Sequence, residues 1–266
     1  MKIACLIGSP PYLNHFVNEV SKKYHIDLVI RETTPINRIA NKILEKGIWN
    51  TINILIYRLK TRRRFRRDCD MYFADTWKSI NNALAIYETY DINEDSVVEK
   101  IRELKPDIIL VYGTSLVKTK VIENVPLVLN LHGGLSPYYR GSYCTEWALL
   151  NSDPENIGYT IHQLSNKIDG GEILTQGRVS ILGDDTANRI NMKLIKEGTQ
   201  DMIRVLGKLQ DKKLPDFQPQ DGTSGFLYLT SHWSFKMQGL VRKLEKEKLT
   251  QMLTKPSRKK LPIKQW

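Results

Sequence analysis

Residues 127–141 read LVLNLHGGLSPYYRG, an apolar run that passes through Asn130 and His132 into a segment rich in glycine. An apolar run bounded by glycine and proline predicts a buried strand that ends in a loop. Side chains alternate along a strand with a period of two residues, so Asn130 and His132 are expected to point the same way. The sequence therefore predicts two adjacent polar side chains at the end of a buried strand.

Predicted strands and helices alternate on both sides of this run. We expect strands at residues 2–8, 26–32, 107–113 and 126–134, followed by a late pair at 157–164 and 171–181. Helices are expected at residues 9–25, 35–67, 93–105, 143–151 and 186–210. This alternation indicates an α/β fold, with a Rossmann-like, mostly parallel sheet and helices on both faces. In such sheets ligands bind outside the carboxyl ends of the strands, where Asn130 and His132 are expected.

The composition of the chain changes near residue 210. We expect residues 1–210 to form the main domain and residues 211–266 to form a small C-terminal appendage. The appendage contains the turn PQDGTSG, a short strand FLYLT, an amphipathic helix and the basic tail KPSRKKLPIKQW, whose end is expected to be mobile.

Charge and cysteine content narrow the class of protein. Forty Lys and Arg against 29 Asp and Glu give a net charge of +11, which favours anionic partners. The three cysteines are odd in number and widely spaced, so neither a disulfide framework nor a structural zinc site is expected. The N-terminal apolar run is too short for a signal peptide, and no run of about 18 apolar residues occurs. We expect a soluble, unprocessed, cytoplasmic protein without a membrane partner.

A second stretch, GYTIHQLSNKIDGGEIL at residues 158–174, supplies His162 and Asp169. An amide, an imidazole and a carboxylate are the groups needed to stabilise an oxyanion and move protons in acyl transfer. The structural alternative is a satisfied polar cap at a strand end. No serine or cysteine nucleophile accompanies these residues at a recognisable spacing, which favours direct attack by a substrate. A metal site is not expected, because His132 and His162 lie far apart without close second ligands.

Taken together, these residues resemble the formyltransferase family that uses 10-formyltetrahydrofolate. The family signature is N-x-H-P-S-L-L-P-x-x-R-G, a downstream T-I-H, and then D-x-G; this chain has NLHGGLSPYYRG, a tryptophan at 147, IGYTIH and IDGG. The resemblance is specific over residues 105–180 and looser over 1–35, and residues 40–90 and 211–266 are not assigned to the family on these motifs. The sequence departs at Gly133 and Gly134, where the family commonly has proline and serine. This departure predicts more room beside His132, which suits a different or bulkier acceptor.

The resemblance also implies roles for individual residues, with residues 1–210 as the catalytic domain. Asn130 would donate its amide, His132 would contact the oxyanion and accept a proton, and Asp169 would orient His132 or a water molecule. His162 is expected to support the site rather than to contact the substrate. Main-chain groups of two loops would bind the formyl donor, 10-formyltetrahydrofolate: Thr114, Ser115 and Leu116, and Asn166, Lys167 and Ile168.

The acceptor implied by the resemblance is the amine of a nucleoside-diphosphate-linked amino sugar. The chain layout resembles enzymes that make formamido sugars for bacterial surface polysaccharides, such as the O-antigen of lipopolysaccharide. The expected acceptor-binding residues are Ser9, Tyr12, Tyr139, Arg140 and Trp147. The aromatic side chains would stack on the base or sugar, and Arg140 would either buttress its loop or hold a phosphate. A homodimer is a further expectation.

Two other interpretations remain open. A methionyl-tRNA formyltransferase-like enzyme would suit the positive charge, but that branch carries a further C-terminal barrel, and only residues 211–266 follow the main domain. A non-catalytic basic protein that binds nucleic acid would retain the shape of the site without using it. The arginine-rich run at 62–67 usually indicates a solvated helix face. A nicotinamide-dependent oxidoreductase is disfavoured, because the glycine-rich fingerprint is missing after the first strand.

Overall fold

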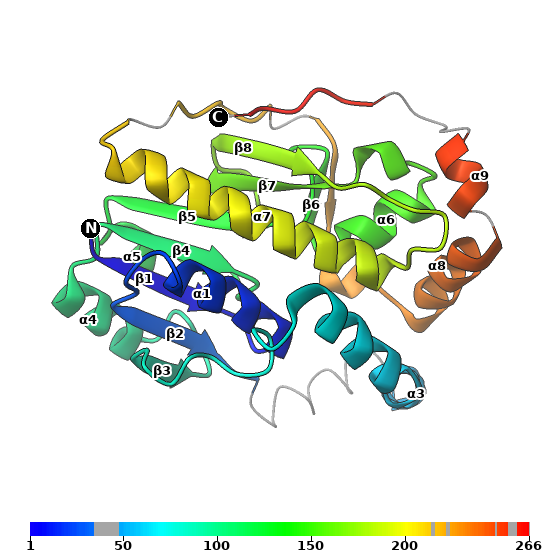
Figure 1. The fold of residues 1–266 in the computed structure, drawn as a ribbon, viewed down its shortest axis with the longest axis horizontal. Coiled ribbons are helices and arrows are strands. Elements are labelled where there is room, and N and C mark those ends of the chain that lie inside the picture. Colours follow the sequence, from blue (N-terminus) through cyan, green and yellow to red (C-terminus); the bar gives the residue numbers. More distant parts are fainter. Residues whose placement is uncertain (35–47, 214–215, 222–223, 248, 255–259, 266) are drawn as a thin grey trace.

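The central feature of the computed structural model is a seven-stranded sheet (Figure 1). The structure describes residues 1–34, 48–213, 216–221, 224–247, 249–254 and 260–265. Within these ranges the sheet order is β3-β2-β1-β4-β5-β7-β8. The strands are β1 (Ile3–Ile7), β2 (Leu28–Glu32), β3 (Ile86–Thr89), β4 (Ile108–Tyr112), β5 (Leu127–His132), β7 (Gly158–Gln163) and β8 (Ile173–Arg178). Strands β1 to β5 pair in parallel, whereas β7 is antiparallel to β5 and to β8. The predicted α/β class is confirmed.

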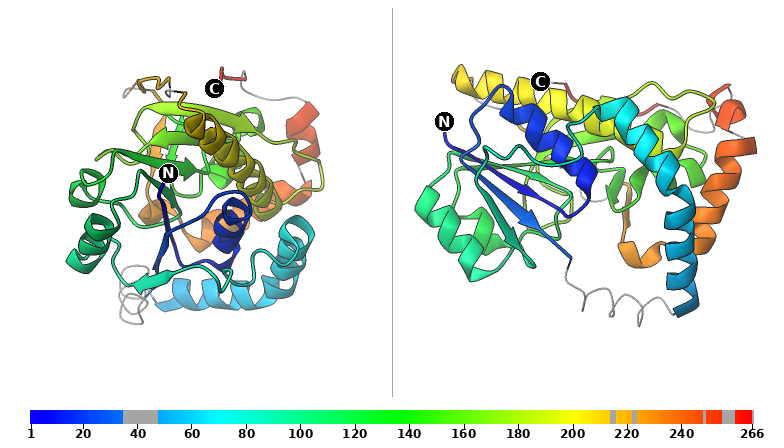
Figure 2. Two further views of the ribbon diagram at one scale, coloured as in Figure 1. Left: turned by 60° about the vertical axis from the view of Figure 1, so that its left-hand side comes forward. Right: turned by 60° about the horizontal axis from the view of Figure 1, so that its bottom comes forward.

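Helices cover both faces of this sheet (Figures 1 and 2). The α-helices are α1 (Asn14–Ser21), α3 (Ile48–Phe73), α4 (Asp95–Leu104), α5 (Thr119–Ile122), α6 (Cys144–Leu150), α7 (Ala187–Gln210), α8 (Phe235–Glu247) and α9 (Leu249–Thr254). Short 3-10 turns are η1 (Pro11–Leu13), η2 (Pro154–Asn156) and η3 (Thr230–His232). Helices α1 and α7 pack in the core cluster on one face, and α4 and α5 pack in the cluster on the other.

Strand β1 illustrates why the sheet is central. All five of its side chains are buried, and Ile3, Cys5 and Ile7 join one core cluster while Ala4 and Leu6 join the other. This alternation is the period of two expected of a strand covered on both faces. A continuous apolar run therefore produces two cores at once, and it leaves only the strand ends free to carry polar groups.

One strand and one helix end differ from the prediction. Strand β3 was not expected, because its short IYET sequence is half polar and largely exposed. Helix α3 runs to Phe73, beyond the predicted end at residue 67, because Cys69 and Phe73 pack into a third core cluster with Met192 of α7. The first part of the helix predicted at 35–67 lies outside the described residues.

The C-terminal appendage packs against the segment that follows β5. Strand β9 (Phe226–Tyr228) pairs in parallel with β6 (Tyr139–Gly141) as a second, two-stranded sheet. Tyr228 stacks on Trp147 of α6 with ring centroids 4.8 Å apart, and Trp233 stacks on Tyr143 at 4.6 Å. Aromatic stacking thus joins residues far apart in the sequence. The division at residue 210 stays a prediction.

The described part of the C-terminal tail lies along the outer strand β8. The carbonyl of Lys264 accepts a hydrogen bond from the Gln176 N–H at 2.7 Å. The Leu261 N–H donates to Asn156 Oδ1 at 2.8 Å, and the Leu261 carbonyl accepts from Arg178 at 2.5 Å. Residues 260–265 therefore make hydrogen bonds with the main fold that a polar, basic sequence does not reveal. The mobile end expected for the tail stays a prediction. No helix within the described ranges has the length and apolar character needed to cross a bilayer.

Deleting residues 260–266 is expected to destabilise the protein by about 1–3 kcal/mol, because buried partners such as Asn156 lose their hydrogen bonds. Urea denaturation followed by circular dichroism measures this change in the free energy of unfolding. Lys260→Ser, which alters one exposed side chain of the same tail, is the control and should change little. Equal stability of the truncated and full-length proteins would show that these contacts contribute nothing in solution.

Candidate active site

Asn130 and His132 lie at the carboxyl end of β5, and both side chains approach Asp169. The distance from Asn130 Nδ2 to Asp169 Oδ1 is 3.3 Å, and that from His132 Nδ1 to Asp169 Oδ2 is also 3.3 Å. The expectation that the two β5 side chains point the same way is confirmed. The structure thus brings the three predicted catalytic residues together, while their catalytic roles stay predictions.

The Asp169 carboxylate is surrounded by donors. Its Oδ2 accepts the Gly141 N–H at 2.8 Å, and its Oδ1 lies 3.5 Å from His162 Nε2. Burial alone would raise the pKa of this carboxyl, but the charge of His132, followed by His162 and the Gly141 N–H, outweighs burial and holds the pKa well below its usual range. Asp169 is therefore an ionised group within a largely enclosed site.

The contacts of His132 indicate where its ring nitrogens carry hydrogen. Its Nε2 lies 2.9 Å from the Tyr139 carbonyl oxygen, which can only accept, so Nε2 carries a hydrogen. Its Nδ1 faces the Asp169 carboxylate, and two acceptors at that distance would repel each other. Both ring nitrogens of His132 therefore face oxygen acceptors, and the positions of the ring hydrogens are inferred from these partners.

His162 holds the amide of Asn130. Its Nδ1 lies 2.9 Å from the Gln163 carbonyl oxygen, and its Nε2 lies 3.0 Å from Asn130 Nδ2. The second Nδ2 hydrogen faces Asp169 at the longer distance of 3.3 Å. His162 is fully buried, which agrees with the supporting position expected for it. To donate to a substrate, Asn130 would have to release the longer of its two contacts.

The two glycines after His132 differ in the space around them. A Cβ added to Gly133 would meet no atom within 4 Å, whereas one added to Gly134 would lie 2.5 Å from His132 Nε2 and from the Tyr139 carbonyl. Cys144 Sγ, which the sequence did not suggest as a neighbour, lies 3.6 Å from His132 Nε2. The expected extra room beside His132 is therefore present at Gly133 and absent at Gly134.

Residues 114–116, the first loop predicted to bind the formyl donor, already make hydrogen bonds within the protein. The Ser115 N–H and hydroxyl both donate to the Glu32 carboxylate at 2.6 Å, and the Leu116 carbonyl accepts from Asn93 at 3.0 Å. Glu32 was not predicted to take part, because a single glutamate at a strand end carries no sequence signal. Within the described part of the chain, the Leu116 N–H has no hydrogen-bond partner. The Leu116 side chain is 52% exposed.

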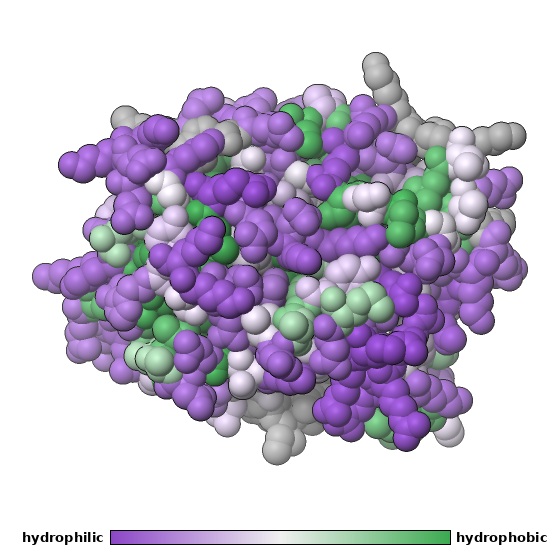
Figure 3. All heavy atoms as spheres, viewed as in Figure 1, coloured by the Kyte–Doolittle hydropathy of each residue, from purple (hydrophilic) through white to green (hydrophobic). Residues whose placement is uncertain are grey.

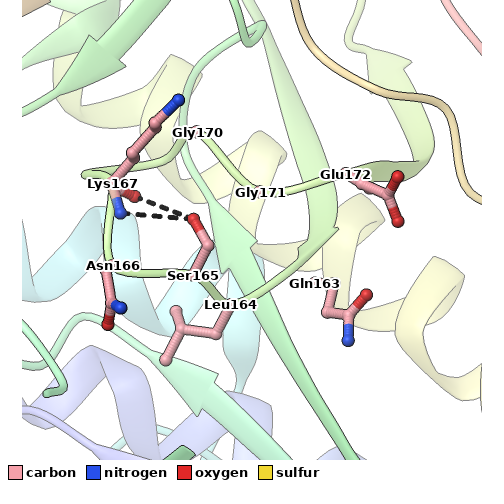
Figure 4. Close-up of a pocket in the computed structure, with 8 residues that line it drawn as sticks. All are labelled: Gln163, Leu164, Ser165, Asn166, Lys167, Gly170, Gly171 and Glu172. Carbon is pink, nitrogen blue, oxygen red and sulfur yellow. Dashed lines mark hydrogen bonds between the residues drawn. The ribbon is translucent and has the colours of Figure 1, made fainter. Parts of the chain in front are cut away.

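The second loop predicted to bind the formyl donor, residues 166–168, borders an open cavity of about 480 Å³ (Figure 4). The cavity is lined by Gln163, Leu164, Ser165, Asn166, Lys167, Gly170, Gly171 and Glu172. Asn166 accepts a hydrogen bond from Thr119 at 2.6 Å, which connects this loop to the start of α5. Ile168 precedes Asp169, and Gly170, which lines the cavity, directly follows it, so the cavity adjoins the predicted catalytic turn along the chain.

Tyr139, one of the expected acceptor-binding residues, lies in the core. It is 3% exposed, its ring stacks on Tyr228, and its hydroxyl donates to Asp153 at 2.7 Å. The expectation that Tyr139 stacks on a base or sugar is therefore not supported. A tyrosine in a glycine-rich segment gave no sign of burial, because the residues that cover it come from distant parts of the chain.

The other expected acceptor-binding residues occupy different surroundings. Trp147 already stacks on Tyr228, whereas the half-buried Tyr12 makes an edge contact with Phe65 of α3. The Ser9 hydroxyl lies 3.3 Å from that of Thr34. Arg140 lies beside the catalytic turn, since a Cβ on Gly170 would come within 3.6 Å of its guanidinium. These four assignments stay predictions.

Two residues near the site carried no sequence signal. Glu146 of α6 is 8% exposed, burial raises its pKa to about 7, and Asn191 donates to it at 3.1 Å. Gln220 of the appendage donates to the carbonyls of Asp169 at 2.9 Å and Gly171 at 2.5 Å. Within the described ranges, no group of His, Cys, Asp and Glu side chains is arranged to hold a metal ion.

A protein-family model described as formyl transferase matches residues 37–206 of the chain. Among solved structures, a 4-N formyltransferase from Francisella tularensis is similar with a TM-score of 0.56 and 17% identity, over 86% of this chain and 76% of that one. An N-formyltransferase from Helicobacter canadensis, solved with folinic acid and dTDP-3-aminofucose, has a TM-score of 0.56 and 17% identity, over 88% of this chain and 72% of that one. A phosphoribosylglycinamide formyltransferase from Anaplasma phagocytophilum has a TM-score of 0.56 and 16% identity, over 86% and 98%. These structural similarities concern the fold.

Gly134→Ala is expected to destabilise the protein by about 1–3 kcal/mol, because the added methyl group displaces His132 or the Tyr139 carbonyl. Gly133→Ala, its matched control, should change the free energy of unfolding by no more than about 0.5 kcal/mol. Chemical denaturation of the two variants beside the wild type measures both values. Similar losses at the two positions would contradict the difference in space around them.

The low pKa of Asp169 predicts a pH-dependent contribution to stability. A carboxyl whose folded-state pKa lies below its unfolded value stabilises the fold above the unfolded value, and loses this effect as the pH falls through the folded value. Asp169→Asn should therefore cost on the order of 3 kcal/mol near neutral pH, and the difference from wild type should shrink below about pH 4. Urea denaturation between acid and neutral pH measures it.

Asp75→Asn is the control for this titration, because Asp75 pairs with Lys78 on the exposed surface. An exposed ion pair contributes little, so this variant should follow the wild type at every pH. A stability difference for Asp169→Asn that is independent of pH would rule out a depressed pKa.

Proposed function

Because the chain belongs to the formyl transferase family, we propose that it transfers a formyl group from 10-formyltetrahydrofolate to the amine of a nucleoside-diphosphate-linked amino sugar. The observation that carries this proposal is the cluster at the end of β5, where Asn130 and His132 meet the Asp169 carboxylate. An amide, an imidazolium and a carboxylate in contact provide the groups that formyl transfer needs.

His132 would stabilise the negative charge that develops when an amine adds to the formyl carbonyl. A positive charge held in an enclosed site stabilises an oxyanion more strongly than it would in water. Asn130 would supply the second donor by releasing its longer contact with Asp169. Both side chains project from one strand, so their spacing depends on the backbone of β5 rather than on a mobile loop.

Asp169 would act by holding His132 charged. With a pKa well below its usual range, its carboxylate is a weak base and a poor acceptor for the proton that the amine loses. This differs from the proton-accepting position expected for His132, because a ring already protonated at both nitrogens has no free lone pair. In this proposal the amine's proton passes through solvent, or through the reacting oxygen, to N10 of the donor; the bond from the formyl carbon to N10 then breaks and releases tetrahydrofolate, while the His132–Asp169 pair keeps its charge.

The formyl donor, 10-formyltetrahydrofolate, would bind between the loops at residues 114–116 and 166–168. Among the described residues the Leu116 N–H remains available as a main-chain donor, and Asn166 and Lys167 of the other loop line the cavity. Main-chain recognition agrees with the exposed and varied side chains of these loops. The folate supplies an activated formyl group there, and these loops would orient its carbonyl towards Asn130 and His132.

The acceptor assignment is supported by Arg140 and by the overall charge. The guanidinium of Arg140 lies near the catalytic turn, and its Nε is buried without a partner among the described residues. An anionic group on the acceptor would satisfy it. The similar protein from Helicobacter canadensis was solved with dTDP-3-aminofucose, a nucleoside-diphosphate amino sugar. A homodimer and a contribution to O-antigen synthesis also remain proposals.

The test is to incubate the protein with 10-formyltetrahydrofolate and a panel of amino-sugar nucleotides, beside formylatable tRNA, and to follow the products by mass spectrometry. Asn130→Ala, His132→Ala and Asp169→Ala should each lower turnover by about 100- to 1000-fold. Met71→Ala, on the exposed side of α3, is the control and should keep full activity. Circular dichroism and the melting temperature establish that each variant is folded.

Losses below about tenfold in all three folded variants would overturn the mechanism. Formyl transfer to tRNA alone, with the steep salt dependence of a contact to many phosphates, would show that tRNA is the acceptor. The assignment to the family would be unchanged. Binding of nucleic acid without any formyl transfer would favour the non-catalytic alternative.

A further inference from the structure

The outer face of α3 carries a strip of exposed apolar side chains. The six residues are Ile48, Trp49, Ile52, Leu55, Ile56 and Leu59, which we call the α3 apolar strip. At about 100° per residue they fall within one arc of about 120° on the helix surface. Trp49 is 76% exposed and Leu59 is 68% exposed. Single exposed apolar residues are common, but a contiguous strip of this size usually indicates a binding surface.

The same face becomes basic in the second half of the helix. Arg62, Arg63, Arg66 and Arg67, the α3 arginine cluster, follow the apolar strip at helical spacing, and all four are exposed. No ion pair to any of them occurs within the described residues; the neighbouring Arg64 is the member of this run that reaches Asp68. The face therefore presents apolar area and unpaired positive charge in succession.

The orientation of α3 is fixed by its inner face. Cys69 and Phe73 are buried against Met192 and Ile195 of α7, and Arg242 of α8 lies over the ring of Tyr57. Figure 2 shows α3 at the edge of the molecule, with its N-terminal half extending beyond the sheet. In Figure 3 the corner over α3 is mainly hydrophilic, with hydrophobic surface at its lower margin. The strip and the arginine cluster are thus held outward by the packing of the opposite face.

The charge of this face selects among possible occupants. A second copy of the chain would bring together two molecules of net charge +11, and it offers no anionic counterpart on this face. A nucleic acid would neutralise the arginine cluster but would leave the apolar strip in water. A bilayer surface with anionic headgroups supplies both an apolar layer and negative charge.

We propose that the outer face of α3 docks on the surface of an anionic lipid bilayer. The apolar strip enters the boundary between headgroups and acyl chains, with Trp49 in the interfacial position that tryptophan prefers. The arginine cluster contacts the lipid phosphates from the adjoining half of the helix. The helix lies on the membrane and does not span it. This proposal differs from the expectation, drawn from the sequence, that the protein has no membrane partner.

Binding to extruded vesicles tests this proposal on the full-length protein. Two compositions are compared by co-sedimentation: phosphatidylcholine alone, and phosphatidylcholine mixed with phosphatidylglycerol. The wild type should bind the anionic vesicles at least tenfold more tightly than the neutral ones. Added salt should weaken that binding, because the arginines act through charge.

Two variants separate the contributions of the two halves of the face. Trp49→Ser with Leu59→Ser should lower binding to both vesicle types by at least tenfold, because the strip supplies the apolar contact. Arg63→Ser with Arg66→Ser should lower binding to anionic vesicles by about fivefold per arginine and should leave the weak binding to neutral vesicles unchanged. These substitutions replace exposed side chains, and Ile56→Ser provides a milder strip variant if the double variant unfolds.

The controls match these changes elsewhere on the surface. Met71→Ser removes an exposed apolar side chain of α3 outside the strip. Lys23→Ser with Lys196→Ser removes two exposed charges, one from the turn after α1 and one from α7. Each control should bind within about twofold of the wild type. All variants should keep the wild-type melting temperature and the formyl-transfer rate measured without vesicles.

Absence of vesicle binding by the wild type would overturn the proposal, as would equal losses in the strip variants and the controls. A dimer in sedimentation velocity that requires the strip, without vesicle binding, would assign the face to a second copy instead. RNA binding that depends on the arginine cluster, without vesicle binding, would assign it to nucleic acid.

Discussion

The contact between the Asp169 carboxylate and the His132 ring organises the surroundings of the candidate site. Asp169 reaches the end of β5 from a turn between β7 and β8, and its two oxygens meet a ring nitrogen, an amide and a backbone N–H. An enclosed carboxylate requires such partners, because burial without them would cost several kcal/mol. The antiparallel pairing of β7 with β5 supplies the geometry, since it places His162 opposite Asn130. The same pairing that extends the sheet therefore also assembles the polar cluster.

The strand end predicted from the sequence is confirmed, because it depends only on local pattern. A buried strand fixes the direction of every second side chain, so the shared direction of Asn130 and His132 follows from their spacing alone. Asp169 was singled out as a carboxylate in a glycine-rich turn after a second strand, and its role was assigned through the resemblance to a family motif. Its low pKa depends on contacts with β5 and with Gly141 that no local pattern contains.

Other features of the structure depend on contacts between distant parts of the chain. Tyr139 looked like a loop tyrosine, and its burial results from Asp153 and Tyr228. Glu146 looked like a surface residue of a short helix, and its burial depends on α7. The α3 apolar strip was hidden for the opposite reason: periodicity predicts a helix, but it does not tell which apolar residues the rest of the chain leaves uncovered. Periodicity is therefore informative about elements and silent about which surfaces meet.

Gln220 changes how the boundary between the catalytic segment and the appendage should be understood. Its side-chain amide binds the carbonyls of Asp169 and Gly171 from beyond the region that the family model covers. The turn that carries Asp169 is therefore held by a residue outside the range that the family model matches. Exchange of the C-terminal segment for that of a relative would then remove these two contacts and alter the support of the Asp169 turn.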